Sequence, residues 1–410
     1  MYIMAPLSPY ADWVVNSDGT ITDLVAGATP TFARTGIKTI DNLNGTITDV
    51  LANKLAVKPR LDGKPGFGAF LEDGTTNAFI RSYFTQLSDV QTWTMDATGT
   101  AVLGSYHIYQ NSQGAALSAG VANVAFWRTF TATAALNSIS CYVYTGSAVT
   151  SADMQLCSLV GSLTPVASLL TTTFTAVGGN WYRATATFTG TAATWTGGVC
   201  VKAGKSVTVD ALQVTTNLSG VLQSYIPTTT GTVVRNMDSL SVPSSGWSLS
   251  ALTIFMVCSD STGGAAERVI DWAGDASNSV VLTNPVSNAW GANTVMANAV
   301  SYSPSTNSTT AGAYDVLTIS YANGAKVIQY VNGTKGNSSA SNMAANLANM
   351  SAAAYVGNRS SGSRAHNAEI SRVVIYNSQL SDANVTTVST FLANGNVSAG
   401  GAGLLMMGVQ

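Results

Sequence analysis

Asn180-Trp-Tyr-Arg-Ala-Thr-Ala-Thr-Phe-Thr-Gly190 is the stretch that decides the fold class of this chain. Tyr182, Ala184, Ala186 and Phe188 occupy alternate positions, with arginine and threonine between them. Residues two apart in a strand share one face of the sheet. The pattern therefore predicts a half-buried antiparallel strand, apolar on one face and polar on the other.

Similar period-two runs recur over residues 78–243, with turn residues between them and no helical periodicity. They predict an antiparallel β-sandwich of the jelly-roll type. A second sandwich is predicted over 244–396. Within it, 252–258 (Leu-Thr-Ile-Phe-Met-Val-Cys) is almost entirely apolar, which indicates a strand buried on both faces. The fold class is therefore all-β, with two sandwiches in tandem.

Two further signals shape the second sandwich. Asn323-Gly324 and Asn332-Gly333 separate runs of strand length, and Asn-Gly is the strongest short hairpin signal because both turn residues can reach positive φ. One helix is predicted, with Ser381 as its N-cap and Gly395 as its end. Its apolar stripe consists of Val385, Val388, Phe391 and Leu392.

The two ends of the chain look different from the sandwiches. Residues 1–77 are irregular and rich in turns, and 397–410 form a Gly-rich, apolar tail. Asn16–Asp23 (Asn-Ser-Asp-Gly-Thr-Ile-Thr-Asp) returns as Asn42–Asp49 (Asn-Leu-Asn-Gly-Thr-Ile-Thr-Asp), which predicts two related hairpins. We expect 1–77 to be separate from the two sandwiches.

The composition excludes several classes of partner. Apolar residues make up 46% of the 410 residues, charged residues only 9%, and 18 Lys+Arg against 20 Asp+Glu give a net charge of −2. A nucleic-acid groove needs a surplus of cations, so no nucleic acid is expected as a partner. No run reaches the roughly 18 apolar residues of a spanning helix, so no membrane insertion is expected.

Little in the sequence suggests catalysis or metal binding. The three glutamates, Glu72, Glu267 and Glu369, are scattered, whereas glycan hydrolysis needs two facing carboxylates. No phosphate-binding or serine-hydrolase motif occurs, and four cysteines without a Cys-x-x-Cys pair do not suggest zinc. We expect a protein that is not an enzyme and has no metal or cofactor. Its cysteines are predicted to be buried thiols, with a Cys141–Cys157 disulfide as the alternative.

Aromatic residues near polar side chains are the candidates for binding, because sugars stack on Trp or Tyr and are read by Asn, Asp and Arg. One group lies in turn-rich stretches: Asp271, Trp272, Asp275 and Trp290. A polar loop adds Asn358 and Arg359. These six residues form the candidate glycan site, and the alternative is that both Trp residues pack in the core.

Several motifs resemble bacteriophage and prophage virion proteins of the tail-fibre or appendage type. Pro59-Arg60 and 71–77 match a segment before the first sandwich, and 77–94 and 180–191 resemble a carbohydrate-binding-like sandwich. The family closes that sandwich with Ser-Tyr-Ile-Pro-Thr, present here at 224–228, followed by Arg and Asp. The resemblance therefore assigns linker roles to four residues: Tyr225, Pro227, Arg235 and Asp238.

The second sandwich resembles a concanavalin A-like, laminin-G-like lectin domain. Residues 321–335 resemble its Tyr-Val-Asp-Gly hairpin, and 354–392 resemble its ending. Asn332 and Asn384 stand where the family frequently has Asp and Glu, so no calcium ligands are assigned.

The resemblance implies a virion structural protein of a tail or capsid appendage that binds host-surface carbohydrate during adsorption. Residues 1–77 would dock onto other virion proteins, and the protein is expected to be a homotrimer located in the virion. The alternatives are a decoration or adaptor protein that binds no ligand and, less favoured, a glycan depolymerase.

Overall fold

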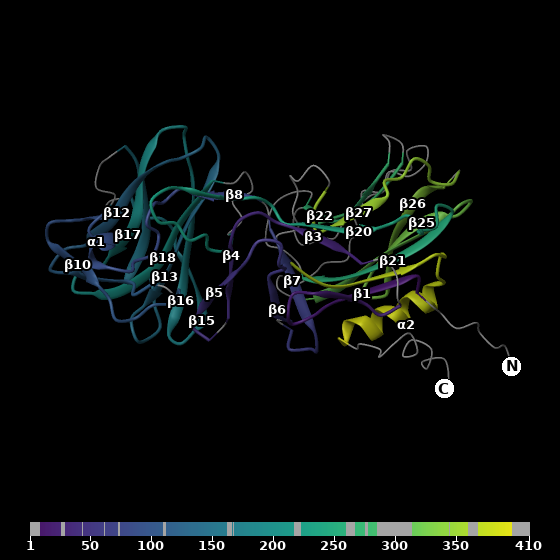
Figure 1. The fold of residues 1–410 in the computed structure, drawn as a ribbon, viewed down its shortest axis with the longest axis horizontal. Helices are drawn as coiled ribbons and strands as arrows, with labels where there is room; N and C mark the ends of the chain where they lie inside the picture. Colours follow the sequence, from purple (N-terminus) through teal and green to yellow (C-terminus); the bar gives the residue numbers. More distant parts are fainter. Residues whose placement is uncertain are drawn as a thin grey trace. The chain divides into compact units, whose positions relative to one another are not determined.

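The computed structural model describes most of the chain as β-strand, divided into two compact units (Figure 1). The described residues are 9–25, 29–42, 44–60, 62–72, 74–109, 112–161, 166, 168–216, 223–259, 267–274, 278–284, 314–343, 345–359 and 368–395. Unit 1 comprises Met1–Arg34, Asn53–Asp73 and Met237–Gln410, and unit 2 comprises Thr35–Ala52 and Gly74–Asn236. The backbone passes between the units four times, after residues 34, 52, 73 and 236.

Unit 1 contains two antiparallel sheets. The strands of its nine-stranded sheet follow the order β2-β1-β28-β21-β24-β25-β26, with β7 also pairing with β28 and β6 with β7. Their bounds are Ile21–Asp23 (β2), Ala11–Val15 (β1), Ala368–Tyr376 (β28), Ala251–Ser259 (β21), Tyr314–Ala322 (β24), Lys326–Val331 (β25), Thr334–Asn342 (β26), Phe67–Leu71 (β7) and Val57–Pro59 (β6). The five-stranded sheet is ordered Ser279–Asn284 (β23), Glu267–Ala273 (β22), Ala353–Val356 (β27), Ser239–Pro243 (β20) and Thr31–Ala33 (β3).

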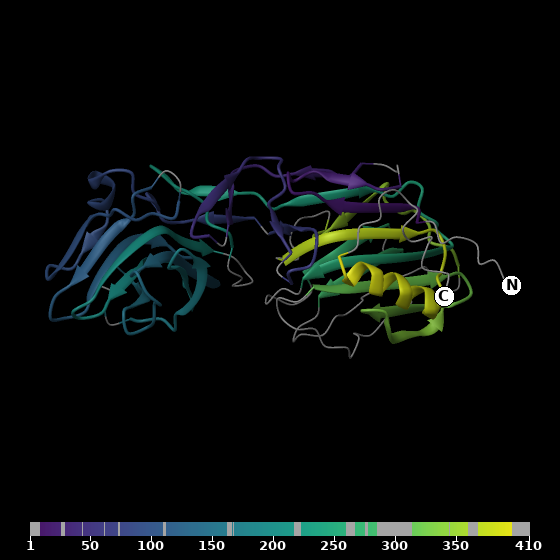
Figure 2. The same cartoon turned by 90° about the horizontal axis from the view of Figure 1, so that it is seen from below.

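A helix makes unit 1 a three-layered structure. Apolar residues of the two sheets, such as Ile254 of β21 and Ile270 of β22, form one core cluster. On its other face, the nine-stranded sheet is covered by α2 (Asp382–Ala393), whose predicted stripe is buried against Phe255 and Val374. Figure 2 shows α2 lying along this face. As predicted, Ser381 caps the helix, with its side chain accepting from Asn384 N, and Gly395 follows the helix with a φ of +69°.

Unit 2 is a sandwich of an eight-stranded and a four-stranded antiparallel sheet. The larger sheet is ordered β10-β11-β18-β13-β16-β15, with β8 joining β18 to β19, and the smaller is ordered β14-β17-β12-β9. The larger sheet contains Gly99–Leu103 (β10), Ala115–Ala119 (β11), Ser206–Thr216 (β18), Leu136–Tyr144 (β13), Trp181–Thr189 (β16), Thr173–Gly178 (β15), Thr75–Asn77 (β8) and Val233–Arg235 (β19). The smaller contains Met154–Val160 (β14), Thr194–Val201 (β17), Val124–Thr131 (β12) and Thr94–Met95 (β9). A short helix, α1 (Leu87–Val90), precedes β9.

The two repeated segments form matching hairpins, one in each unit. Gly19, with φ +77°, lies between β1 and β2, and Gly45, with φ +83°, lies between β4 (Lys38–Asp41) and β5 (Ile47–Val50). In each hairpin the side-chain amide of the first Asn donates to two threonine hydroxyls, Asn16 to Thr20 and Thr22 and Asn42 to the corresponding residues of its own hairpin. The prediction of two related hairpins is therefore confirmed.

Residues 1–77 do not form a separate segment, and the predicted boundaries differ from the observed ones. Within these residues, β1 pairs with β28 and β3 pairs with β20 in unit 1, whereas β8 pairs with β18 in unit 2. These strands are short and contain few apolar residues, so the sequence shows no strand pattern for them. They form strands by pairing with segments that lie far away in the sequence. The tail at 397–410 lies outside the described residues.

Candidate functional site

The candidate site lies on the face of the five-stranded sheet that points away from the core of unit 1. Directly opposite residues of an antiparallel sheet share one face. Asp271 of β22 is opposite Tyr355 of β27, Tyr355 is opposite Ser241 of β20, and Ser241 is opposite Thr31 of β3. Val281 of β23 completes this row. Tyr355, the aromatic member of the row, is half-buried.

The neighbouring row on the same strands shows why this face is distinct from the core. Its members are apolar and all belong to the core cluster or pack against it: Leu282, Ile270, Val356, Leu240 and Phe32. The alternation of the two rows places polar and aromatic side chains on the outer face of the sheet.

Two arginines lie next to the carboxylate of this row. Arg268 Nε is 4.0 Å from Asp271 Oδ2, and Arg359 follows β27. Burial raises the pKa of Asp271 above its ordinary value, and the positive charges of Arg268 and Arg359 offset part of that rise. The group combines a carboxylate acceptor, guanidinium donors and a phenol ring.

Trp272 does not belong to this face, so the prediction that its ring stacks on a sugar is wrong. Its side chain is 1% exposed, its ring centroid lies 4.9 Å from that of Trp247, and its Nε1 donates to Ser351 O over 2.9 Å. Asp271 and Trp272 are consecutive residues of β22, so they point to opposite faces of the sheet. The alternative prediction, core packing, is confirmed for Trp272.

The other predicted site residues have different outcomes. Asn358 is 1% exposed, with its amide donating to Asp238 O over 3.1 Å and its carbonyl accepting from Arg359 N over 2.8 Å. It fixes the turn after β27 and offers no surface to a ligand, which corrects its prediction as a glycan contact. Arg359 directly follows Asn358, and its positive charge lowers the pKa of Asp271. Asp275 and Trp290 lie outside the described residues.

Three of the four predicted linker residues lie in unit 2. Arg235 is fully buried, and its Nη1 donates to Ser224 Oγ over 2.6 Å and its Nη2 to Gln223 Oε1 over 2.9 Å. Tyr225 is 1% exposed, and its hydroxyl contacts Ser82 Oγ at 2.6 Å. Pro227 lies between β18 and β19.

Asp238, the fourth, lies in unit 1. Its Oδ1 accepts from Arg34 Nη1 at 3.3 Å, its Oδ2 accepts from Glu72 N at 3.0 Å, and both charged side chains of the ion pair are fully buried. Asp238 therefore holds together three segments of unit 1 that are distant in sequence.

Tyr355 is the site residue that the sequence analysis missed. It lies in Ala353-Ala-Tyr-Val356. The period of two places its side chain on the other face of the sheet from Ala354 and Val356, which are both core residues. Applying the same period to 267–273 would have separated Asp271 from Trp272. The alternation of residues with period two is present in both short strands, but only the register shows that the two strands are neighbours.

In the part of the chain that the structure describes, no helix is long and apolar enough to cross a membrane. No group of three or more His, Cys, Asp or Glu side chains there could hold a metal ion.

A family model described as the concanavalin A-like lectin/glucanases superfamily matches residues 228–386, which include β20 to β28 and the candidate site. The chain contains a concanavalin A-like lectin/glucanase domain. This lectin-like domain accounts for most of unit 1, although strands from 11–71 complete its sheets. No curated protein matches the chain significantly.

Solved structures similar to part of the chain include three distant proteins. Trypanosoma rangeli sialidase aligns with a TM-score of 0.31 and 14% identity, over 38% of this chain and 26% of that one. The binding domain of botulinum neurotoxin serotype G gives 0.30 and 13%, over 38% and 40%. The SAP-like pentraxin of Limulus polyphemus gives 0.29 and 12%, over 37% and 72%. The chain thus spans about a quarter of the length of the sialidase.

Proposed function

We propose that the lectin-like domain binds carbohydrate on the outer face of its five-stranded sheet. The observation that carries the proposal is the register that sets Tyr355 opposite Asp271, beside Arg268 and Arg359. A phenol ring offers a stacking face to the apolar side of a sugar, and carboxylate and guanidinium groups hydrogen-bond its hydroxyls. This is the small set of polar groups around an aromatic contact that a saccharide site requires.

The proposed activity is binding without cleavage. In most glycosidase families, hydrolysis of the glycosidic bond uses two carboxyl groups roughly 5–10 Å apart. Among the described residues of the row, Asp271 is the single carboxylate, and Arg268 and Arg359 lie next to it.

We further propose that the protein is a structural component of a phage appendage and binds host-surface glycans. Support comes from the sequence motifs at 59–77, 180–191 and 224–238 that resemble virion proteins. Docking onto other virion proteins would use surfaces of the two units, because the strands of 1–77 are part of their sheets. The homotrimeric state and the location in the virion belong to the same proposal, and a non-binding adaptor is the alternative.

The first test is binding of the purified full chain to an array of immobilised oligosaccharides. Tyr355→Ala should weaken the binding of any saccharide that the lectin-like domain recognises about tenfold or more, because a stacking contact is lost. Tyr10→Ala is the matched control, since Tyr10 is 41% exposed and precedes β1 in the other sheet of the same unit. Equal affinities of the two variants would contradict the proposed site.

The second test concerns adsorption. The purified protein is mixed with host cells before phage is added, and blocking of infection by the wild type but not by Tyr355→Ala would support receptor binding. A folded oligomer that binds neither cells nor saccharides would favour the adaptor function. Trp272→Ala is unsuitable for this test, because loss of a buried Trp costs about 3–5 kcal/mol of stability.

A further inference from the structure

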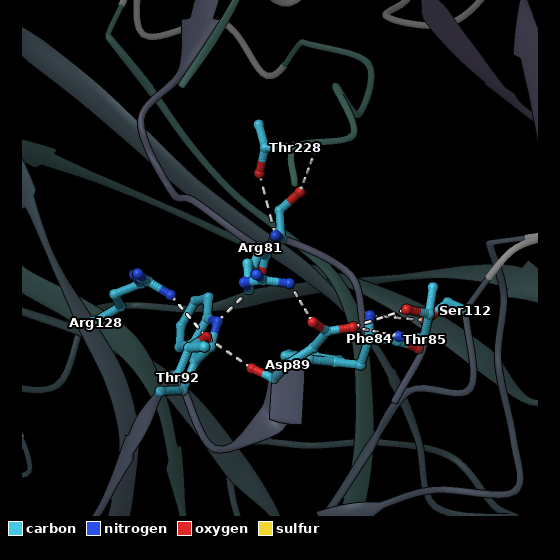
Figure 3. Close-up of polar contacts among 10 residues, drawn as sticks. Arg81, Phe84, Thr85, Asp89, Thr92, Ser112, Arg128 and Thr228 are labelled. Atoms are coloured by element: carbon cyan, nitrogen blue, oxygen red, sulfur yellow. Dashed lines mark hydrogen bonds and ion pairs between the residues drawn. The ribbon is translucent and has the colours of Figure 1, made fainter. Parts of the chain in front are cut away.

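Unit 2 holds a pair of arginines that the proposed lectin site does not use (Figure 3). Arg81 follows β8, and Arg128 lies in β12. Arg81 forms an ion pair with Asp89 at α1, and Arg128 Nη1 donates to Thr92 Oγ1 over 2.8 Å. Thr92 Oγ1 in turn donates to Asp89 O over 2.7 Å. Thr92 and Asp89 thus link the two guanidinium groups.

The backbone of Arg81 is held in an unusual conformation. Its φ is +54°, in the left-handed region that residues other than glycine rarely adopt. Its N–H donates to Thr229 O over 2.8 Å, and its carbonyl accepts from Trp93 Nε1 over 2.9 Å. Strained backbone of this kind persists only where the surroundings fix it, and it is enriched at binding sites. The side chain of Arg81 remains 33% exposed.

The charges of the pair are not balanced. Asp89 accepts from Thr85 N and Thr85 Oγ1 as well as from Arg81, so its carboxylate is already well occupied. Among the described residues, no carboxylate forms an ion pair with Arg128. Burial, and then the positive charge of Arg81, lower the pKa of Arg128. One more negative charge at this place would relieve the repulsion.

We propose that Arg128 and Arg81 form an anion site that binds the carboxylate of an acidic saccharide. A guanidinium presents parallel N–H donors that match the two oxygens of a carboxylate. The adjoining segment 85–92 exposes neutral hydrogen-bonding side chains, namely Thr85, Gln86, Ser88, Gln91 and Thr92. A sugar with one carboxylate among hydroxyls fits two cations in neutral surroundings better than an acidic peptide does.

The test is calorimetric titration of the full chain with trigalacturonate and with its neutral methyl ester. We expect binding of the acid that is weakened at least about tenfold in Arg128→Gln, the usual effect of losing a hydrogen bond to a charged group. Lys205→Gln is the matched control, because it removes the same charge from unit 2 at a side chain that is 47% exposed and paired with Asp153. Tyr355→Ala, in unit 1, should leave this affinity unchanged, so the two proposals can fail separately.

Four outcomes would overturn the proposal. They are no binding by the folded wild type, equal binding of the methyl ester, equal losses in Arg128→Gln and Lys205→Gln, and tight binding of hexaglutamate in place of trigalacturonate. Thermal unfolding of each variant shows whether it is folded. If Arg128→Gln fails to fold, Arg81→Lys provides a second test. It keeps the positive charge but loses the parallel N–H donors of the guanidinium, so it should weaken binding of the acid.

Discussion

Asp12 and Arg372, 360 residues apart in the sequence, form a buried two-bond ion pair inside unit 1. Arg372 Nε donates to Oδ1 over 2.7 Å and Nη2 to Oδ2 over 2.6 Å. The guanidinium also lies 5.7 Å from the ring centroid of Phe391 in α2. A single arginine of β28 therefore contacts both the first described strand of the chain and its last helix.

Breaking this pair should destabilise unit 1 strongly. In Asp12→Ala the buried guanidinium loses its partner, and we expect a loss of about 3–5 kcal/mol in the free energy of unfolding, measured by urea denaturation. Lys335→Ala is the control, because its pair with Asp382 is exposed and should be worth less than about 1 kcal/mol. Similar losses of unfolding free energy in the two variants would show that the Asp12–Arg372 ion pair does not stabilise unit 1 more than an exposed ion pair does.

The pH dependence of stability should carry a contribution from Asp271. Because burial raises its pKa above 3.8, the folded protein holds this proton more tightly than the unfolded chain does. The unfolding free energy should therefore fall as pH rises from about 3.8 through the raised pKa, and then stay level. Urea denaturation from about pH 3 to about pH 7 should show this fall as a decrease in the unfolding free energy of the wild type relative to that of Asp271→Asn. Parallel profiles of the two proteins would contradict it.

The repeated hairpins allow a glycine substitution to be tested once in each unit. A Cβ on Gly19 would lie 2.9 Å from Leu55 O, and one on Gly45 would lie 2.9 Å from Gly178 O. Gly63 has a comparable φ of +71° but open space around it. Gly63→Ala should lower the free energy of unfolding by about 1–2 kcal/mol, because alanine is disfavoured at a positive φ. Gly19→Ala and Gly45→Ala should lower it more, because the added methyl group also meets a backbone oxygen.

Hydrogen exchange followed by mass spectrometry would localise these losses. Faster exchange is expected in the nine-stranded sheet for Gly19→Ala and in β4, β5 and their neighbours for Gly45→Ala. Equal losses of unfolding free energy in the three alanine variants would contradict this prediction, because they would show that the backbone oxygens near Gly19 and Gly45 move away from the added methyl group without a measurable loss of stability.

The cysteines give a prediction that needs no variant. Cys141, Cys157, Cys200 and Cys258 are all free and buried. Burial raises the pKa of Cys200 to about 11 and raises that of Cys141 as well, so thiolate is scarce at neutral pH. We expect no reaction with a thiol reagent in the native state, and four reacting thiols in denaturant without reductant. A count of two would indicate the Cys141–Cys157 disulfide instead.

Strongly periodic and capped segments could be predicted from the sequence. The strand expected around 180–190 is β16, Trp181–Thr189, and the helix after Ser381 has its expected stripe buried. The apolar run at 252–258 lies in β21, which is buried on both faces. Asn332 and Gly333 have the positive φ values that a tight turn requires. In each case the signal lies within one element and its immediate neighbours.

Pairing between distant strands could not be predicted in the same way. Thr31–Ala33 and Val57–Pro59 have only three residues each, too few to show a period, and only their partners make them strands. The candidate site had the same difficulty, because Tyr355 and Asp271 become neighbours only through the register of β22 and β27. The prediction for Trp272 is wrong for a local reason, because an aromatic residue near two aspartates is also typical of a loop.

The four passages of the backbone between the units have a consequence for how such a protein can evolve. Neither unit is encoded by one uninterrupted stretch of its gene, because residues 1–73 contribute to both. Recombination at a single breakpoint between residues 34 and 237 would leave strands of unit 1 without their partners, even where unit 2 stays whole. Variation in what this chain binds should therefore arise by substitution on the existing sheets, while the two sandwiches are inherited as one piece.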